Sequence, residues 1–417
     1  MSKAIKKSQG MSLTVKILIG TAAGIIFGSV VGPWASNLKF LGDVWIRLLQ
    51  MSVVPLVMTS VILAVGSIDM RIVGRMGLHT CKWVALFTLT ACAFGIIMGY
   101  VFQPGVGVTI VDPSDIVPPE VSGIADTVLS FFSTNIINSM ANGAMVPCMV
   151  FSIFFGLAAG IYGSNSGDDS MIKGVKTLNS VIMNIIKMVM NLSPIGIFFL
   201  MANVSGAIGF RVIIPMVKFL GAMAIGTIAQ FLIFIPLAGT VARVNPFKIP
   251  QKVSKVATIA LTTTSSQICL PTQMEDSVTK LGVSRRISDF CGPIGCTMNS
   301  TGAAMWDVFS VFFMAQASGV QLTVQQITVT VVIAILLSMG NVGIPGGTAM
   351  ILAFMATSMG LPLDSIALLM SIDWFAGMFR TVLNVVVDML VALMVAADMK
   401  ELDRDVFNGV KTVEYVR

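Results

Sequence analysis

The chain has 417 residues, of which 55% are hydrophobic and only 11% are charged, and its formal net charge is +6. Soluble domains are about one quarter charged, so this composition excludes an ordinary soluble protein. The apolar runs are too long for barrel strands, and helices and closed barrels are the only structures that span a bilayer. The composition therefore predicts an all-α, multi-pass membrane protein.

Other features of the composition exclude several function classes. The basic residues cluster in loops, as the positive-inside rule predicts, and do not indicate binding of nucleic acid. Six scattered cysteines contain no CxxC spacing, so we expect neither metal binding nor disulfides from them. The single histidine, His79, cannot build a catalytic triad or a metal-hydrolase centre, so we expect no enzyme. The N-terminal MSKAIKKSQG lacks a small-residue cleavage site and predicts a retained cytosolic tail.

The first part of the chain predicts six apolar segments. The loop 104–124 is acidic and has no Lys or Arg, so we expect it outside the cell. Basic residues gather near the N-terminus, at 71–82 and at 241–256, so we expect these parts, and both termini, on the cytoplasmic side of the inner cell membrane. The predicted segments are 13–31, 41–66 with Pro55 inside, 81–102, a broken segment at 125–163, 176–205 with Pro194 inside, and 212–241.

Two later segments are interrupted by residues that disfavour helices. Residues 253–281 hold two half-length apolar arms around TTTSSQICLP, and residues 324–361 hold two more around GNVGIPGG. Non-helical backbone at membrane depth occurs where it lines a cavity or is buried in protein. Paired interruptions predict two re-entrant hairpins of a transporter with inverted repeats. Two short kinked spanning helices, or loops outside the membrane, are the alternatives.

A third interruption lies between these hairpins. In residues 285–318 the sequence GCTMNSTGAAMWD places Asn299, Ser300, Thr301 and Gly302 inside an apolar helix. A helix that opens here frees backbone carbonyl oxygens, which are hard ligands suited to small cations.

The polar stripe of the last apolar segment, residues 373–390, is the strongest candidate for a site. Helical spacing places Asp373, Gly377, Arg380, Asn384 and Asp388 along one face. A charge at the centre of a membrane helix costs ~2.5–3.5 kcal/mol, so such residues face a protein interior or a water-filled cavity. The stripe predicts a binding site, and the alternative is a structural Asp–Arg contact between two helices.

Five motifs in chain order resemble the glutamate transporter family (dicarboxylate/amino acid:cation symporters) along nearly the whole chain. They are RLLQMSVVPLVMTS, the Ser-rich tip ending in LP, MNxxG, GxPGG and DWFxxMFRTVLNVxxD. The resemblance implies eight transmembrane helices plus two re-entrant hairpins, a homotrimer in the lipid bilayer and an elevator mechanism of secondary active transport. The implied scaffold comprises 1–77 (helices 1 and 2) and 125–211 (helices 4 and 5). The implied transport domain comprises 78–124 (helix 3 and the external loop) and 212–417 (helix 6, hairpin 1, helix 7, hairpin 2 and helix 8).

The resemblance also implies roles for residues. Arg380 matches the arginine that holds the substrate's side-chain carboxylate, and a guanidinium fork binds a carboxylate bidentately. Two implied Na⁺ sites would close the second hairpin only when ion and substrate are both present. The implied substrate-binding residues are Ser265, Ser266, the backbone of Ile344–Gly347, Gly377, Arg380, Thr381 and Asn384. The first implied Na⁺ site contains Gly295, Asn299, Asn384 and Asp388, and the second contains Thr297, Ser338, Met339 and Asn341.

Departures from the family pattern affect the predicted cations. Thr301 replaces the usual Asp inside MNxxG, and Val84, Phe87 and Thr88 stand where its partners on the third helix are expected. Too few oxygen ligands are left there to replace the hydration shell of Na⁺, so we expect the third sodium site to be absent. Asp307 stands where some relatives carry a Glu linked to proton movement, and an apolar setting favours the protonated form of an acid. The alternative for Asp307 is an ion pair or a solvated polar position.

Other departures affect the predicted substrate. Gly377 stands where amino-acid carriers have an Asp that binds the substrate ammonium, and Ala303 replaces a Thr that helps to bind the carboxylate. The favoured prediction is Na⁺-coupled symport of a C4-dicarboxylate-type anion that needs no amino group. The alternatives are an amino acid symporter, with Asp373 as the ammonium partner, and an anion channel. Trp306 and Gln267 could shape a different pocket, although packing and a hairpin-tip hydrogen bond also explain them.

Overall fold

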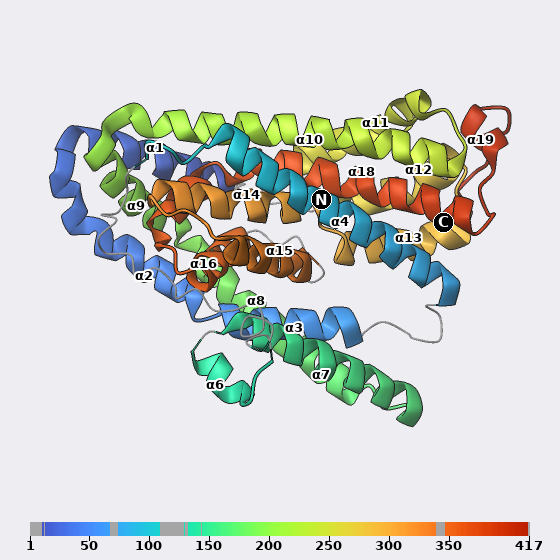
Figure 1. Ribbon diagram of the computed structural model, residues 1–417, viewed down its shortest axis with the longest axis horizontal. Helices are drawn as coiled ribbons and strands as arrows, with labels where there is room; N and C mark the ends of the chain where they lie inside the picture. The colour runs from blue at the N-terminus through green and yellow to red at the C-terminus, as the bar shows by residue number, and fades with distance from the viewer. Residues whose placement is uncertain are drawn as a thin grey trace, which may run out of the picture.

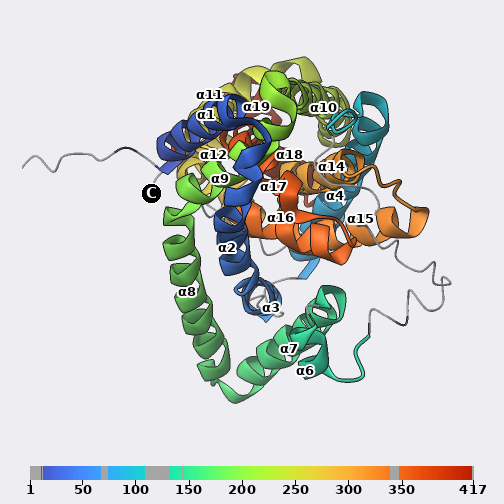
Figure 2. The same ribbon diagram turned by 90° about the vertical axis from the view of Figure 1, so that its left-hand side faces the viewer.

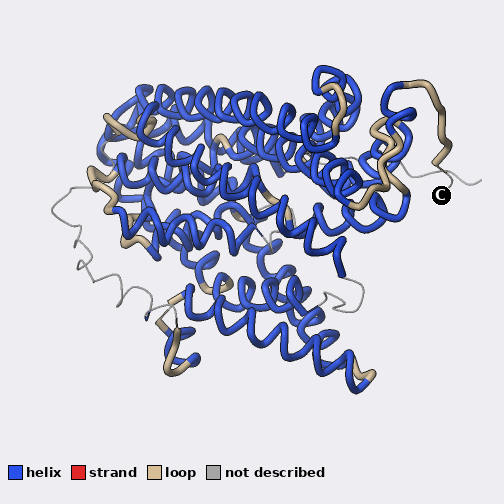
Figure 3. Tube along the Cα trace, turned by 45° about the vertical axis from the view of Figure 1, so that its right-hand side comes forward, coloured by secondary structure: helices blue, strands red, loops and turns tan. Residues whose placement is uncertain are grey.

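The computed structural model describes residues 13–66, 74–108, 132–142, 144–338 and 347–415, together with residues 11 and 129. Within those residues every regular element is a helix, and one isolated β-bridge pairs Val283 with Leu402 (Figure 3). Five described helical stretches are long and apolar enough to cross a membrane, and a pair bent by 51° could count as a sixth. The stretches are Val15–Leu48, Arg75–Phe102, Pro147–Ser166, Gly209–Ala242 and Asp373–Asp398, and the bent pair is Ser170–Asn191 with Ser193–Gly206.

The helices of the first part follow the predicted segments, with two further breaks. The first predicted segment, 13–31, matches its helix at both ends. The segment 41–66 is divided, because Pro55 lies in the first turn of a helix, where its missing N–H is not needed. The segment 176–205 is divided one residue before a helix that carries Pro194 in its first turn. These helices are α1 (Leu13–Val31), η1 (Gly32–Leu38), α2 (Lys39–Gln50), α3 (Val53–Gly66), α6 (Ile136–Ala141), α7 (Met145–Ser166), α8 (Ser170–Asn191) and α9 (Ser193–Ile208).

These helices pack mainly on one another (Figure 2). α1 lies along α9, and a Cβ added at Gly24 of α1 would approach the carbonyl oxygen of Phe198 to 2.5 Å. Glycine is therefore needed for the two backbones to come this close. α2 also contacts α9, and α3 contacts α7 and α8. Contacts with the second part of the chain include those of α2 and α3 with α16, of α3 with α15, and of α1 and α9 with α17.

The remaining helices surround two buried ones (Figure 1). Nearly all of α14 is buried, as is most of α18 after Leu383, and α4, α10, α11 and α13 pack around them. Outward side chains of α10 are apolar and exposed, for example Leu232 at 72%, which suits a lipid environment. The helices are α4 (Gly74–Phe102), η3 (Gly209–Val212), α10 (Ile213–Ala242), η4 (Pro246–Lys248), α11 (Ile249–Thr263), α12 (Ser266–Thr279), α13 (Arg285–Met298), α14 (Thr301–Ala317), α15 (Val324–Ser338), α16 (Gly347–Ser358), η5 (Leu363–Ser365), α17 (Ile366–Ser371), α18 (Asp373–Asp398) and α19 (Arg404–Asn408).

The three predicted interruptions fall between helices. The first separates α11 from α12 at Thr264, whose φ of +50° is uncommon for a β-branched residue. The second separates α13 from α14 at Asn299, whose backbone is extended. The third separates α15 from α16, and residues 339–346 there lie outside the described part of the chain.

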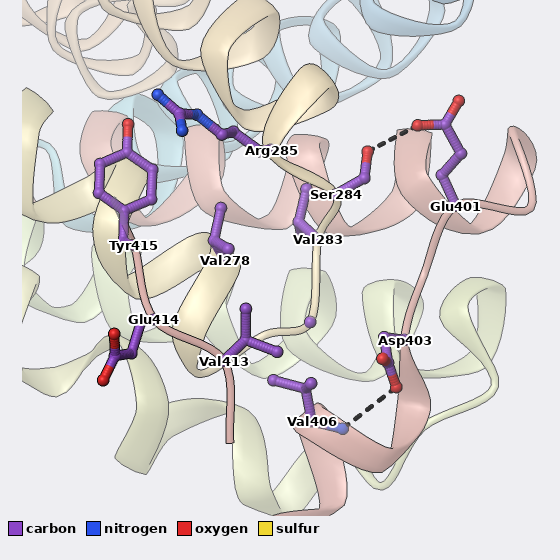
Figure 4. A pocket seen from close by; sticks show the side chains of 11 residues that line it. Val278, Val283, Ser284, Arg285, Glu401, Asp403, Val406, Val413, Glu414 and Tyr415 are labelled. Atoms are coloured by element: carbon purple, nitrogen blue, oxygen red, sulfur yellow. Dashed lines mark hydrogen bonds between the residues drawn. The ribbon is translucent and has the colours of Figure 1, made fainter. Parts of the chain in front are cut away.

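The chain after α18 is hydrogen-bonded to the segment just before α13. The backbone N–H of Asp403 donates to the carbonyl of Gly282 at 2.8 Å, and Ser284 Oγ donates to Glu401 Oε2 at 2.6 Å. A cavity of about 420 Å³ lies between these segments, with Tyr415 on its wall (Figure 4). Its lining contains none of the residues predicted to bind substrate or cation, so this cavity is separate from the candidate site.

Candidate functional site

Arg380 is the centre of a polar cluster built from three helices. Its Nη2 donates to Asp373 Oδ1 at 2.6 Å, two helical turns away on α18. Its Nη1 donates to Thr348 Oγ1 of α16 at 3.3 Å, and the guanidinium lies 4.8 Å from the ring centre of Trp306 of α14. The side chains of Arg380 and Asp373 are 14% and 22% exposed. The arginine is therefore oriented and neutralised, but still accessible.

Gly377 leaves free space beside this arginine. A Cβ built at Gly377 would lie 3.5 Å from Arg380 Nη2 and 3.8 Å from Thr264 Cβ, which are ordinary contact distances. A Cβ could therefore be added at this position without a backbone shift. The same distances place the tip of the first hairpin against α18, one turn before Arg380. Ser265 and Ser266 follow Thr264 directly and are half-buried.

Asp388 is the centre of a second, deeper cluster. Asn299 Nδ2 donates to Asp388 Oδ1 at 2.6 Å, and Thr301 Oγ1 donates to Asn299 Oδ1 at 2.6 Å. The N–H of Gly302 donates to Asn384 Oδ1 at 2.7 Å, so the opened start of α14 is tied to α18. Asp388 is only 2% exposed, and among the described residues its Oδ2 has no hydrogen-bond partner.

The Asp388 cluster has the chemistry of a site for a small cation. A Cβ at Gly295 would lie 2.6 Å from Asp388 Oδ1, so the backbone of α13 runs directly beside the carboxylate. The amide oxygens of Asn299 and Asn384 each accept one hydrogen bond and keep a second lone pair. A buried carboxylate needs a positive partner, and hard oxygen ligands suit alkali cations. No group of three His, Cys, Asp or Glu side chains that could hold a metal ion occurs in the described chain.

The structure brings together only part of the predicted site. Thr381 is buried on α18 next to Arg380. Asp307 is 2% exposed on α14, within electrostatic range of Arg380 and of Cys92 on α4. Thr297 and Ser338 lie in the helices α13 and α15, and Gly347 is the first residue of α16. Met339, Asn341 and Ile344 lie outside the described residues, so the second Na⁺ site and most of the second hairpin tip stay predictions.

Two residues near the clusters were missed by the sequence reasoning. Thr348 accepts a hydrogen bond from Arg380, but nothing in the sequence around it indicates that its side chain lies at the Arg380 cluster. Gln273 of α12 interacts with Asp388, and its Oε1 lacks a hydrogen-bond partner among the described residues. A glutamine inside a half-length apolar arm was a usable signal, because polar residues at membrane depth usually have a role.

The family model and the relatives that match this chain are all described as transport proteins. The chain matches the model of the sodium:dicarboxylate symporter family over residues 13–398. It is 29% identical over 381 residues to a proton/glutamate-aspartate symporter of Bacillus subtilis (strain 168), covering 89% of this chain and 91% of that protein. It is 30% identical over 414 residues to a C4-dicarboxylate transport protein of Rhizobium johnstonii, covering 95% and 91%. It is 28% identical over 403 residues to a proton/sodium-glutamate symport protein of Bacillus caldotenax, covering 93% and 94%.

Proposed function

The chain belongs to the sodium:dicarboxylate symporter family, whose members named above are transporters and not enzymes, and we propose that it carries a small C4-dicarboxylate-type anion together with a cation. The observation that carries this proposal is the accessible guanidinium of Arg380 beside the open position Gly377. The guanidinium offers a carboxylate two parallel hydrogen bonds. At Gly377 no side chain is present to bind an ammonium group.

Substrate binding begins with an exchange of partners at Arg380. Asp373 holds Nη2 at 2.6 Å, so an entering carboxylate competes with this internal one. The exchange replaces one ion pair by another, so little charge is desolvated without compensation. Thr348, in the arm of the second hairpin, contacts Arg380, and Thr264, at the tip of the first, lies next to Gly377. The two hairpins would close over the bound anion at these residues.

A specific observation also favours a second candidate, symport of an amino acid. The Asp373 carboxylate lies inside the Arg380 cluster and not on a remote face of α18. When the substrate carboxylate takes Arg380, the released Asp373 becomes an acceptor for an ammonium group. The glutamate and aspartate transporters among the relatives make this substrate class the natural comparison.

Cation coupling would act through Asn384. This residue lies one turn after Arg380 and one turn before Asp388, and its Oδ1 also accepts from Gly302. A Na⁺ ion held by Asp388, Asn299, Asn384 and the Gly295 carbonyl would supply the positive charge that the buried carboxylate lacks. It would also fix the opened start of α14, which carries Trp306 toward Arg380. A second Na⁺ under the second hairpin, and a proton on Asp307, complete the proposed coupling.

The proposal also includes how the site moves. The helices of 1–77 and 125–211 would form the scaffold of a homotrimer, and the regions 78–124 and 212–417 would move as an elevator. The support is the packing pattern, in which α1 to α3 and α7 to α9 contact mainly one another, while α4 and α10 to α18 form a separate buried centre.

Counterflow in proteoliposomes tests the proposal. Vesicles preloaded with unlabelled succinate should take up external labelled succinate, and a parallel series with aspartate measures the second candidate. An anion channel would give no counterflow. Arg380→Ala should abolish the exchange, whereas Arg211→Ala, an exposed arginine on η3, should retain it. Unchanged exchange in Arg380→Ala would remove the assignment of an anionic substrate.

A further inference from the structure

The turn between α10 and α11, residues 243–248, presents positive charge and an outward aromatic ring, and is called the basic turn below. Arg243 and Lys248 are exposed. Phe247 is 90% exposed, the largest fraction among the large hydrophobic side chains of the described residues. Lys252 and Lys255 follow Lys248 at helical spacing on α11. None of the ion pairs between described residues involves Arg243, Lys248 or Lys252. The basic turn therefore carries positive charge that no described carboxylate neutralises.

Hydrogen bonds fix the backbone of the basic turn. Asn245 Oδ1 accepts from the N–H of Phe247 at 3.0 Å and caps the short helix η4. On the α10 side, Arg404 of α19 donates from Nε and Nη2 to the carbonyl of Ala242 at 3.1 and 3.0 Å. The Phe247 ring is therefore presented outward by a backbone that is tied down on both sides.

The basic turn directly follows a candidate membrane span. That span is Gly209–Ala242, and its residues 219–242 contain no charged side chain. As a helix this uncharged stretch is about 36 Å long, slightly more than the ~30 Å hydrocarbon core of a bilayer. α10 lies at the edge of the bundle in Figure 1 and Figure 2, and Ile228 and Leu232 on it are 60% and 72% exposed, as lipid-facing side chains would be. The span therefore ends where the headgroups begin, and it places the basic turn among them.

The chemistry of the basic turn matches lipid headgroups of net negative charge. A lysine or arginine near a membrane surface gains about 1 kcal/mol from anionic lipids. An aromatic ring beside such residues enters the boundary between headgroups and acyl chains, while the long basic side chains reach the phosphates. Headgroups without net charge provide no such electrostatic gain, so they match the ring but not Arg243 and Lys248.

We propose that the basic turn docks on anionic phospholipid headgroups, with Phe247 inserted below the phosphates and with Arg243 and Lys248 paired to them. The inference goes beyond the proposed transport function, and it requires neither the proposed substrate nor the elevator movement. It requires only that α10 crosses the bilayer. The alternative surroundings of Phe247 are water and another protein.

The experiment measures how brominated phospholipids quench the fluorescence of a tryptophan placed in the basic turn. Phe247→Trp protein is reconstituted in vesicles of phosphatidylcholine and phosphatidylglycerol, with the same mole fraction of brominated lipid supplied as one or the other. The unmodified protein is measured in parallel, because the chain has five tryptophans of its own. Phosphatidylglycerol should be enriched about fivefold at the added tryptophan, which corresponds to about 1 kcal/mol. Leu232→Trp, on the exposed side of the same helix, is the matched control and should be quenched equally by both lipids.

Arg243→Ser with Lys248→Ser, added to Phe247→Trp, should reduce the enrichment to about one. Absence of quenching at position 247 by either lipid, while Leu232→Trp is quenched, overturns the docking and leaves water or a protein contact. Equal quenching by the two lipids, or an enrichment that survives the double substitution, overturns the assignment to anionic headgroups. If Phe247→Trp does not fold, the thermal midpoint in mixed micelles decides. Phosphatidylglycerol should then raise the midpoint of the unmodified protein more than that of the Arg243→Ser, Lys248→Ser variant, and equal rises overturn the proposal.

Discussion

Introducing a carboxylate at Gly377 should change the substrate class. Gly377→Asp places a negative charge beside Arg380, because a Cβ there lies 3.5 Å from Nη2 and meets no backbone. With Asp373 and Arg380 the cluster is neutral, and the substitution makes its net charge −1. A substrate carboxylate on Arg380 would then lie about 5 Å from the new carboxylate. At an effective dielectric constant near 20, this repulsion is about 3 kcal/mol per negative charge.

That energy corresponds to a loss of affinity for succinate of roughly a hundredfold. An amino acid that places its ammonium at the same position gains a similar attraction, so aspartate should be preferred over succinate. Competition of unlabelled succinate and aspartate against labelled uptake in proteoliposomes gives both affinities. Gly377→Asn is the control, because it has nearly the same size and no charge, and should change the two affinities much less. The reasoning is refuted if succinate affinity is unchanged, or if the unmodified protein already prefers acidic amino acids.

Three further predictions concern coupling and movement. Asp307→Asn mimics the protonated acid, so uptake should lose its pH dependence near neutrality; an unchanged pH profile would exclude Asp307 as the proton carrier. Lys39 Nζ of α2 pairs with Asp364 Oδ1, just before α17, at 2.7 Å. A partly exposed ion pair is worth up to about 1 kcal/mol. Lys39→Ala should therefore shift the equilibrium between the two positions of the transport domain relative to the scaffold by up to about fivefold, as measured by cross-linking, and Lys39→Asp with Asp364→Lys should restore it. Failure of that exchange to restore the equilibrium would show that the pair does not control it. Reversal potentials should give fewer than three Na⁺ per substrate, and a value of three would contradict the predicted loss of the third site.

Much of the fold was predictable because strong local signals fix it. The ends of α1 follow from a long apolar run in which Lys16 is the one charged residue. The breaks at Thr264 and Asn299 follow from polar, helix-disfavouring residues inside apolar segments. The break between α2 and α3 was missed, because no glycine marks it and Pro55 is a helix-starting residue there. Proline in a first turn and proline inside a helix look alike in sequence.

The candidate site was predicted less completely than the fold. Helical spacing correctly placed Asp373 and Arg380 on one face of α18, and the structure adds that they are paired. The contacts of Thr348 with Arg380 and of Gln273 with Asp388 join helices that are far apart in the sequence. Local periodicity carries no information about such pairs, which depend on how α12, α16 and α18 pack together.

The central claim is that the chain couples a cation gradient to the movement of a carboxylate. The most direct measurement is the accumulation of labelled succinate in proteoliposomes with an inward Na⁺ gradient, compared with equal Na⁺ on both sides. The account predicts transient accumulation above the external concentration with the gradient, and none in Arg380→Ala. Equilibration without accumulation, for both succinate and aspartate and under both Na⁺ and proton gradients, would contradict it.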